Sequence, residues 1–257
     1  VPRMSKKTKR RIFRVSLIVI PLLLMALLAY WISNWYYKPS FVHYPAFGID
    51  IPVNYSIHGI DVSKHQKTIG WQEVKKMEYG KVKIGFAIMK ATEGLGRVDE
   101  QFRRNWLHAK RAGISRGAYH FFIASKSGKA QAENFMETVR LEKGDLPPVL
   151  DVEQTYGTDK TTLQQRVHDW LQAVERRYGM KPILYSNVDF YETYLADRFG
   201  DYPLWVAHYF AKEKPRTNHP WIFWQHSETG RVNGIGTAVD FNVFKGDSAA
   251  FRSLLKP

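Results

Sequence analysis

Short apolar runs alternate with longer runs of helical periodicity between residues 58 and 178. The apolar runs are centred near residues 60, 87, 119 and 150, so they recur about every thirty residues, the length of one strand–helix unit. In the segment after each run, apolar positions return at helical spacing, which is typical of a helix with one buried face. Strands are expected at 58–63, 84–91, 117–122 and 148–153, and helices at 71–77, 100–112, 130–141 and 161–178. This alternation predicts a parallel sheet covered by helices.

The rest of the chain departs from this alternation. Residues 182–185 predict a fifth strand, and residues 189–196 predict a short helix. Three more strands are expected at 204–208, 221–225 and 238–242, with no clear helical pattern between them. The eight strands and five helices predict an α/β fold, a modified TIM-like barrel that is regular in its first half and irregular in its last.

Asp151 and Glu153 stand two positions apart at the end of the fourth apolar run. On a strand such residues face the same side, about 6.7 Å apart. Paired carboxyl groups at this separation are what cleavage of a glycosidic bond needs. For an isolated Asp-x-Glu, the alternative is that one carboxylate caps the next helix and the other pairs with a surface arginine. The other acids favour the first interpretation, because Asp61, Glu93 and Asp240 also fall at strand ends, where barrels of this kind carry their function.

An uncharged, strongly apolar run at 15–37 follows a basic tail, 1–14, that contains seven lysines and arginines. As a helix, residues 12–32 would measure about 31 Å, close to the thickness of the hydrocarbon core of a bilayer. Aromatic residues cluster at the end of the run, as they do at membrane interfaces. We therefore expect a single span through the lipid bilayer. A cleaved signal peptide is the alternative, although no small-x-small cleavage site precedes the bulky aromatics.

The positive charge around this span predicts its orientation. Seven basic residues precede it and Lys38 alone lies just after it. This asymmetry places the N-terminus in the cytoplasm and the rest of the chain in the periplasm or outside the cell. Residues 38–56 carry three prolines among aromatic residues and predict an extended stalk. Gly-Ile-Asp occurs at 48–50 and 59–61, and the second copy, followed by a helix at strand–helix spacing, is taken to open a domain at 57–257.

The composition excludes several functions. The chain has no cysteine, which excludes disulfides, thiolate metal sites and cysteine nucleophiles. The net charge is +14, but residues 39–257 contain 30 basic and 24 acidic residues, a net +6, so no nucleic-acid partner is expected. Phosphate-binding glycine loops, His-Glu-x-x-His and Gly-x-Ser-x-Gly do not occur. We expect no metal, no cofactor and a monomeric protein.

Seven short motifs, in order along the chain, carry a resemblance to a known family. They are Gly-Ile-Asp-Val-Ser-Lys-His-Gln (59–66), Lys-Ala-Thr-Glu-Gly (90–94), Gly-Ala-Tyr-His-Phe-Phe (117–122), Leu-Asp-Val-Glu (150–153), Leu-Trp-Val-Ala-His-Tyr (204–209), Trp-Gln (224–225) and Val-Asp-Phe-Asn (239–242). Together they resemble the family 25 glycoside hydrolases, the lysozyme-type N-acetylmuramidases. The resemblance implies a (β/α)5(β)3 barrel that cuts the β-1,4 bond between N-acetylmuramic acid and N-acetylglucosamine in peptidoglycan glycan strands. It does not extend to the N-terminal span or the stalk.

The resemblance also implies a role for each matching residue. Glu153 becomes the general acid. The chemistry of the pair adds that Asp151 stays ionised and assists. Because both carboxyl groups project from one strand on one side of the sugar, the acetamide group of the substrate is the expected attacking group; attack by water, which a separation of about 6.7 Å also allows, is the alternative. Asp61 and Asp240 position the substrate or tune the pair. The residues expected to line the groove are Tyr119, Tyr185, Trp205, Tyr209, Gln225, Glu93 and Asn242. These keep alternatives: the aromatic residues belong to the core at the end of the barrel, Asn242 orients Asp240 or caps the bottom of the barrel, and Glu93 is a loop charge.

Two other functions are alternatives to a muramidase. A chitinase-type barrel also ends a strand with Asp-x-Glu, but its longer pattern needs acids where this chain has Leu146 and Val149. A membrane-tethered module that binds the cell wall without cleaving it fits the fold equally well. It has no need of a repelling pair of carboxylates, so the retention of all four acids favours an enzyme.

Overall fold

The computed structural model describes residues 5–36 and 40–257. The chain divides into two compact units, residues 1–40 and 41–257. Parts of three predicted segments lie outside the described residues: residues 1–4 of the basic tail, Tyr37 at the end of the predicted span, and Lys38 and Pro39 at the start of the predicted stalk.

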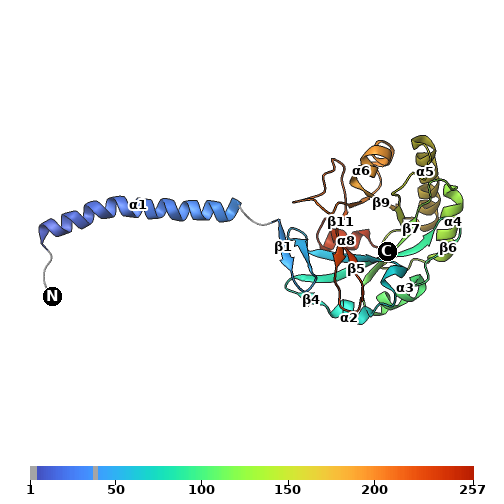
Figure 1. Ribbon diagram of the computed structural model, residues 1–257, viewed down its shortest axis with the longest axis horizontal. Helices are drawn as coiled ribbons and strands as arrows, with labels where there is room; N and C mark the ends of the chain where they lie inside the picture. Colours follow the sequence, from blue (N-terminus) through green and yellow to red (C-terminus); the bar gives the residue numbers. More distant parts are fainter. Residues whose placement is uncertain (1–4, 37–39) are drawn as a thin grey trace. The chain divides into compact units, whose positions relative to one another are not determined.

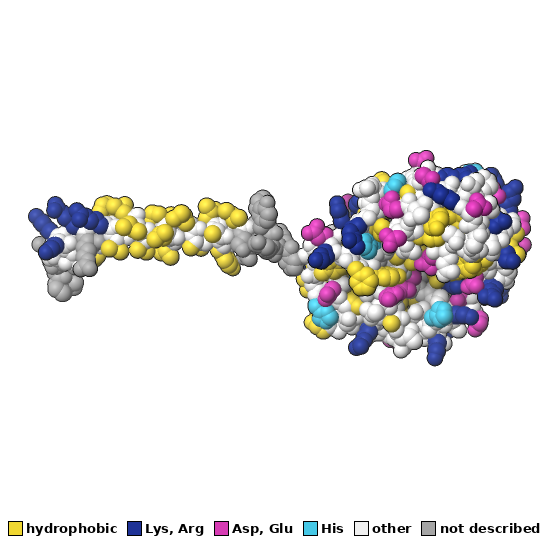
Figure 2. All heavy atoms as spheres, turned by 45° about the horizontal axis from the view of Figure 1, so that its top comes forward, with side chains coloured by type: hydrophobic (Ala, Val, Ile, Leu, Met, Phe, Trp, Pro, Cys, Tyr) yellow, Lys and Arg dark blue, Asp and Glu magenta, His cyan; other side chains and the backbone are white. Residues whose placement is uncertain are grey.

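The first unit is a single helix, α1 (Lys6–Tyr36). Its stretch from Lys6 to Ile32 is long and apolar enough to cross a membrane, a statement about length and composition that a signal sequence would also satisfy. Figure 2 shows hydrophobic side chains along this helix and Lys and Arg side chains gathered at its amino-terminal end. The helix starts well before residue 15, where the predicted span begins, because lysine and arginine are good helix formers.

The second unit is a closed barrel of eight strands, in agreement with the predicted fold class. Around the barrel the order is β3, β5, β7, β8, β9, β10, β11 and β12, and β12 pairs with β3 to close it. All neighbours are parallel except at β12, which is antiparallel to both β11 and β3. The strands are β3 (Ile57–Val62), β5 (Val82–Glu93), β7 (Ser115–Phe121), β8 (Val149–Asp151), β9 (Ile183–Asn187), β10 (Leu204–Ala207), β11 (Phe223–Gly230) and β12 (Val239–Phe244).

Helices lie on the outside of the first half of the barrel (Figure 1). Those predicted from periodicity are α2 (Trp71–Lys76), α3 (Phe102–Arg111), α4 (Gly128–Thr138), α5 (Lys160–Tyr178) and the broken helix α6 (Val188–Phe190), η2 (Tyr191–Leu195) and α7 (Ala196–Phe199). Elements not predicted are η1 (Lys64–Gln66), α8 (Ser248–Leu254) and the two-residue strands β4 (Glu78–Tyr79) and β6 (Arg97–Val98). Local signals fix α5: the Asp159 side chain accepts from the Thr162 amide, and Gly179 ends the helix at φ 66°.

Aromatic rings fill the amino-terminal end of the barrel interior. Phe86 lies 5.0 Å from Phe223, measured between ring centroids, and α8 adds Phe251, 5.7 Å from Phe86. Gly59 on β3 makes room for this packing, since a Cβ there would lie 2.4 Å from the Phe86 ring. The unpredicted helix α8 therefore closes the bottom of the barrel, and the opposite end of the barrel is left to polar side chains.

The predicted extended stalk is wrong for residues 41–56, which belong to the folded unit. Strands β1 (Phe41–Tyr44) and β2 (Ile49–Pro52) form an antiparallel hairpin. The turn between them buries Phe47 completely, with its ring 5.4 Å from that of Phe241 on β12. The Arg231 amide also donates to the Phe47 carbonyl. The aromatic residues that suggested a stalk are instead contacts with the outside of the barrel.

Replacing Phe47 by alanine tests whether the hairpin is part of the folded domain. A fully buried phenylalanine leaves a cavity when truncated, so Phe47→Ala should lower the free energy of unfolding by about 3–5 kcal/mol in chemical denaturation. Val42→Ala, on an exposed position of the same hairpin, should change it by about 0.5 kcal/mol or less. Equal stabilities of the Phe47→Ala protein and the parent would mean that the hairpin does not pack on the barrel.

Candidate active site

A pocket of about 270 Å³ opens at the carboxyl-terminal end of the parallel strands. Its lining brings together residues from all eight strands of the barrel and the segments just after some of them. They are Asp61, Ser63, His65, Lys90, Tyr119, Phe121, Asp151, Glu153, Tyr185, Trp205, Tyr209, Gln225, Glu228 and Asp240. Asp240 reaches this rim although β12 runs the other way, because it lies near the start of that strand, opposite Asp61 in the register. All four predicted catalytic acids therefore share one cavity.

Asp61 and Asp240 form one buried carboxyl pair. Burial raises the pKa of Asp61, and hydrogen bonds from the Asn242 and Gln225 amides oppose that shift. Burial also raises the pKa of Asp240, to about 9, and the negative charge of Asp61 adds to the effect. Because Asp61 receives two amide donors, it is the better acceptor of the two. Asp240 therefore holds a proton at neutral pH beside an Asp61 that is stabilised as the anion.

Two amide side chains orient Asp61 and are themselves held by aromatic residues. Gln225 Nε2 donates to Asp61 Oδ2 at 2.8 Å, and Gln225 Oε1 accepts from the hydroxyls of Tyr185 and Tyr209, each at 2.8 Å.

On the other side of Asp61, Asn242 Nδ2 donates to the same oxygen at 2.7 Å. Asn242 Oδ1 accepts from Trp205 Nε1 at 2.8 Å, and the Trp205 ring lies 4.5 Å from that of Tyr185. These contacts leave each amide only one orientation, so both point their donors at Asp61.

Asp151 and Glu153 form the second carboxyl pair. Asp151, the last residue of β8, is 6% exposed, and Glu153 follows two residues later and is half-buried. Burial is the main cause that raises the pKa of each, and the charge of Glu153 raises the pKa of Asp151 further. From the sequence, the proton of this pair was expected on Glu153. The unliganded structure instead favours it on Asp151, because Asp151 is the more deeply buried of the two.

Asp151 also has unused hydrogen-bonding capacity. Its Oδ1 atom is buried and has no hydrogen-bond partner among the described residues. Tyr185 lies near Glu153 and lowers the pKa of that carboxyl by hydrogen bonding. The single Tyr185 hydroxyl proton also serves Gln225, so it can stabilise Glu153 only when it leaves Gln225.

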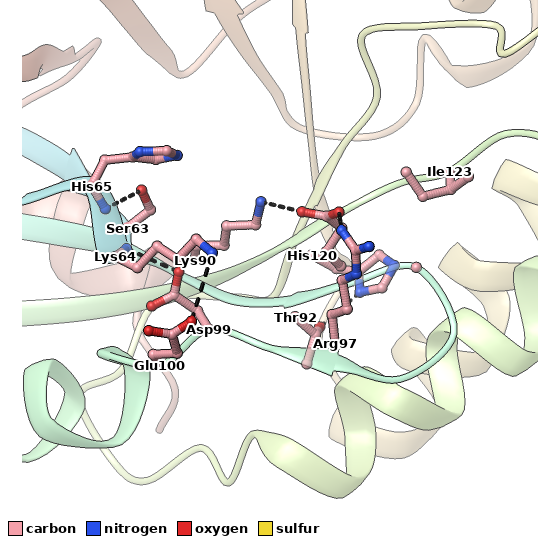
Figure 3. A network of polar contacts seen from close by, with 12 residues as sticks. Ser63, Lys64, His65, Lys90, Thr92, Arg97, Asp99, Glu100, His120 and Ile123 are labelled. Carbon is pink, nitrogen blue, oxygen red and sulfur yellow. Dashed lines mark hydrogen bonds and ion pairs between the residues drawn. The ribbon is translucent and has the colours of Figure 1, made fainter.

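Lys90 is the only lysine or arginine in the lining of this pocket, as far as the described residues go. Lys90 Nζ donates to Glu93 Oε2 at 2.6 Å. The register of β5 against β7 shifts between Lys90 and Thr92. Arg97 donates to the other oxygen of Glu93 at 2.9 Å. Figure 3 shows Lys90 and Arg97 joined by dashed lines to the same carboxyl group. Lys90 Nζ also lies over the Phe121 ring, 4.6 Å from its centroid. The positive charge of Lys90 lowers the pKa of both Asp151 and Glu153, against the effect of burial.

The structure separates two of the predicted groove residues from the rest. Tyr119, Tyr185, Trp205, Tyr209 and Gln225 line the pocket. Asn242 does not line it, and its contacts are those of a residue that orients Asp61 rather than one that caps the barrel bottom.

Glu93 also lies outside the pocket, in the ion pairs with Lys90 and Arg97. Five lining residues were not predicted: Ser63, His65, Lys90, Phe121 and Glu228. All but Glu228 lie within the motifs at 59–66, 90–94 and 117–122, so the motifs carried a signal for four of the five.

A closed barrel that carries two adjacent buried carboxyl groups at its strand ends has the arrangement of a glycoside hydrolase. Residues 60–235 match the family model described as Glycosyl hydrolases family 25, and the chain belongs to that family. The match begins after the β1–β2 hairpin, so the hairpin lies outside the region that defines the family.

Similar proteins agree with this assignment. The protein named Uncharacterized protein YegX of Escherichia coli O6:H1 is 43% identical over 251 residues, which cover 93% of this chain and 92% of its own. Lysozyme M1 of Streptomyces globisporus is 35% identical over 213 residues, 77% of this chain and 71% of its own. The solved structure of a family 25 glycosyl hydrolase from Bacillus anthracis superposes with a TM-score of 0.71 and 31% identity, covering 79% of this chain and 95% of that one.

The raised pKa of Asp240 predicts a pH-dependent cost to stability. The folded protein keeps a proton on Asp240 up to about pH 9, whereas an unfolded chain releases it near 3.8. The parent should therefore lose stability as the pH rises through this window. Asp240→Asn removes the titration, so the variant should not lose stability in this way. In denaturation curves, its free energy of unfolding minus that of the parent should therefore increase as the pH rises from 4 to 9. The control Gln72→Ala, at an exposed position with no titrating group, should show a constant difference. A constant difference for Asp240→Asn would contradict the raised pKa.

Proposed function

We propose that this chain is an N-acetylmuramidase that hydrolyses the β-1,4 bond between N-acetylmuramic acid and N-acetylglucosamine in peptidoglycan. The observation that carries the proposal is the Asp151–Glu153 pair in one pocket with Asp61 and Asp240. Family membership supports the reaction class, and the relative named Lysozyme M1 supports the substrate. No metal or cofactor is needed, because proton transfer and a neighbouring carboxylate are enough for this bond cleavage.

Glu153 is the general acid in this proposal. It is the more exposed member of its pair, so a glycosidic oxygen can approach it, and burial keeps its pKa above the ordinary value. It donates its proton to the leaving oxygen as the bond between that oxygen and the anomeric carbon breaks. The carboxylate that remains can then take a proton from the water that completes hydrolysis.

Asp151 holds the acetamide group of the muramic acid ring. Its free Oδ1 can accept a hydrogen bond from the acetamide N–H, which favours the ionised form of Asp151. Substrate binding thus reverses the preference of the unliganded pocket and leaves the proton on Glu153. The polarised acetamide oxygen attacks the anomeric carbon while the leaving oxygen departs, and water then opens the resulting ring. Asp61, as the ionised carboxylate, and Asp240, as the neutral acid, hold substrate hydroxyls nearby.

Analysis of the products tests the reaction. The protein should solubilise purified peptidoglycan, and reduction of the new ends with borohydride should yield muramitol. Glucosaminitol would indicate a glucosaminidase. No new reducing ends would support the alternative, a module that binds the wall without cleaving it.

The role of Glu153 predicts a large and selective loss. Glu153→Gln keeps the shape of the side chain and removes the proton donor, so kcat should fall by about 10²–10⁴-fold while binding of peptidoglycan persists. Glu133→Gln, the same change at an exposed position on α4, should leave kcat unaltered. Near-normal turnover by Glu153→Gln would assign the acid to another residue of the rim.

The acetamide route predicts the configuration of the first product. Two displacements at one carbon restore the original configuration, so the new reducing end should appear first as the β-anomer. Proton NMR during the first minutes of hydrolysis, before mutarotation, measures this. An initial α-anomer would indicate direct attack by water and a single displacement.

We also propose that α1 anchors the enzyme in a membrane with its basic end in the cytoplasm. The helix is long and apolar enough, and the basic residues stand on one side of it. Alkaline phosphatase fused after Lys38 should therefore be active in a bacterial host, and the full-length chain should stay in the membrane fraction. An inactive reporter would reverse the orientation, and a mature form that begins near residue 30 would mean a cleaved signal peptide.

A further inference from the structure

A second cavity, of about 550 Å³, lies between the β1–β2 hairpin and the segment that follows β10. The hairpin contributes Phe41, His43 and Asp50, and the segment after β10 contributes Phe210 and Lys212. His43 and Asp50 face each other across the hairpin, with Nδ1 and Oδ1 2.8 Å apart. The volume is in the range of sites that hold a small ligand.

This cavity adjoins the catalytic pocket. Tyr209 lines both: its hydroxyl donates to Gln225 inside the catalytic pocket, and the same residue forms part of the wall of the second cavity. A polymer that is cut at Asp151 and Glu153 must continue away from the cleaved bond on both sides. Because the two cavities share Tyr209, the second lies beside the first, on the side of the segment that follows β10.

The chemistry of the lining suits a sugar. Phe210 is 89% exposed, an unusual position for a phenylalanine in a folded domain, and a flat aromatic face in solvent can stack on the apolar face of a sugar ring. Asp50 accepts hydrogen bonds and Lys212 donates them, so hydroxyl and amide groups find partners of both kinds. The lining residue His226 has two ring nitrogens without a hydrogen-bond partner among the described residues.

We propose that the hairpin and the segment after β10 form an additional subsite for an amino sugar of the same glycan strand, beyond the sugars held in the catalytic pocket. This proposal rests on the proposed function, because the glycan strand is the substrate that enters the pocket. The family match begins after the hairpin but includes Phe210 and Lys212, so the proposed subsite combines residues from outside and inside the matched region. It gives the enzyme a preference for long glycan strands over short ones.

The dependence of cleavage on chain length tests the subsite. Full-length protein in detergent micelles is given peptide-free glycan oligosaccharides of two to eight sugars. The parent's kcat/KM should rise with length until the subsite is filled. Phe210→Ala should reduce kcat/KM on the longest substrate about tenfold, equivalent to about 1.4 kcal/mol, and reduce it less on the shortest. Asp50→Ala, in the exposed wall of the hairpin, should change the length dependence in the same direction.

Leu107→Ala, an exposed apolar side chain on α3, is the matched control and should follow the parent at every length. An unaltered length dependence in Phe210→Ala would overturn the subsite. An effect of Phe210→Ala without one of Asp50→Ala would remove the hairpin from it. An effect seen only with peptide-bearing substrates would assign the cavity to the stem peptide instead.

Binding to the Glu153→Gln chain separates failure of the subsite from failure of the proposed function. Calorimetry with the eight-sugar oligosaccharide should show weaker binding when Phe210→Ala is added to that chain. If the parent cleaves nothing and this difference persists, the subsite stands and the muramidase proposal fails. If the parent cleaves and the difference is absent, the subsite alone is wrong.

Discussion

The free-energy cost of burying negative charge determines how the side chains are arranged in the pocket at the carboxyl-terminal end of the parallel strands. A single pocket holds one lysine and five carboxyl groups, those of Asp61, Asp151, Glu153, Glu228 and Asp240. The protein meets the cost at Asp61 with two amide donors from Gln225 and Asn242. At Asp240 and Asp151 it meets the cost by protonation, since burial raises both pKa values.

The contacts that orient Gln225 and Asn242 follow from this constraint. An amide group can offer its oxygen or its nitrogen, and only the nitrogen stabilises a carboxylate. The hydroxyls of Tyr185 and Tyr209 fix Gln225, and the indole of Trp205 fixes Asn242. Residues that look like groove aromatics in the sequence therefore also determine the charge of an acid that they do not touch. The antiparallel direction of β12 completes the arrangement, because it brings Asp240 opposite Asp61.

The sequence predicts the barrel well because each strand is a short apolar run that is buried locally and on both faces. It predicts four of the five acids of the pocket, all except Glu228, for the same reason, since strand ends meet at one rim. Contacts between distant segments are less visible. Residues 41–52, whose prolines suggested an extended segment, form a hairpin that Phe47 holds against Phe241. The placement of the proton on Asp151 depends on depth of burial, which no spacing of residues indicates.

The β1–β2 hairpin links these observations to the substrate. Its buried side holds it to the barrel through Phe47, and its exposed side turns His43 and Asp50 towards the cavity next to Tyr209. A segment outside the family region thus widens the binding surface of a site that the family region builds. The same chain carries α1, a helix that is long and apolar enough to cross a membrane.

The central claim is that burial keeps protons on carboxyl groups of this pocket at neutral pH. Titration of ¹³C-labelled aspartate and glutamate carboxyls by NMR, with single substitutions to assign each signal, measures this directly. Asp240 should titrate at about pH 9, and the Asp151–Glu153 pair should hold one proton well above the ordinary values of 3.8 and 4.5. Four carboxyls that all titrate at or below those ordinary values would contradict the account.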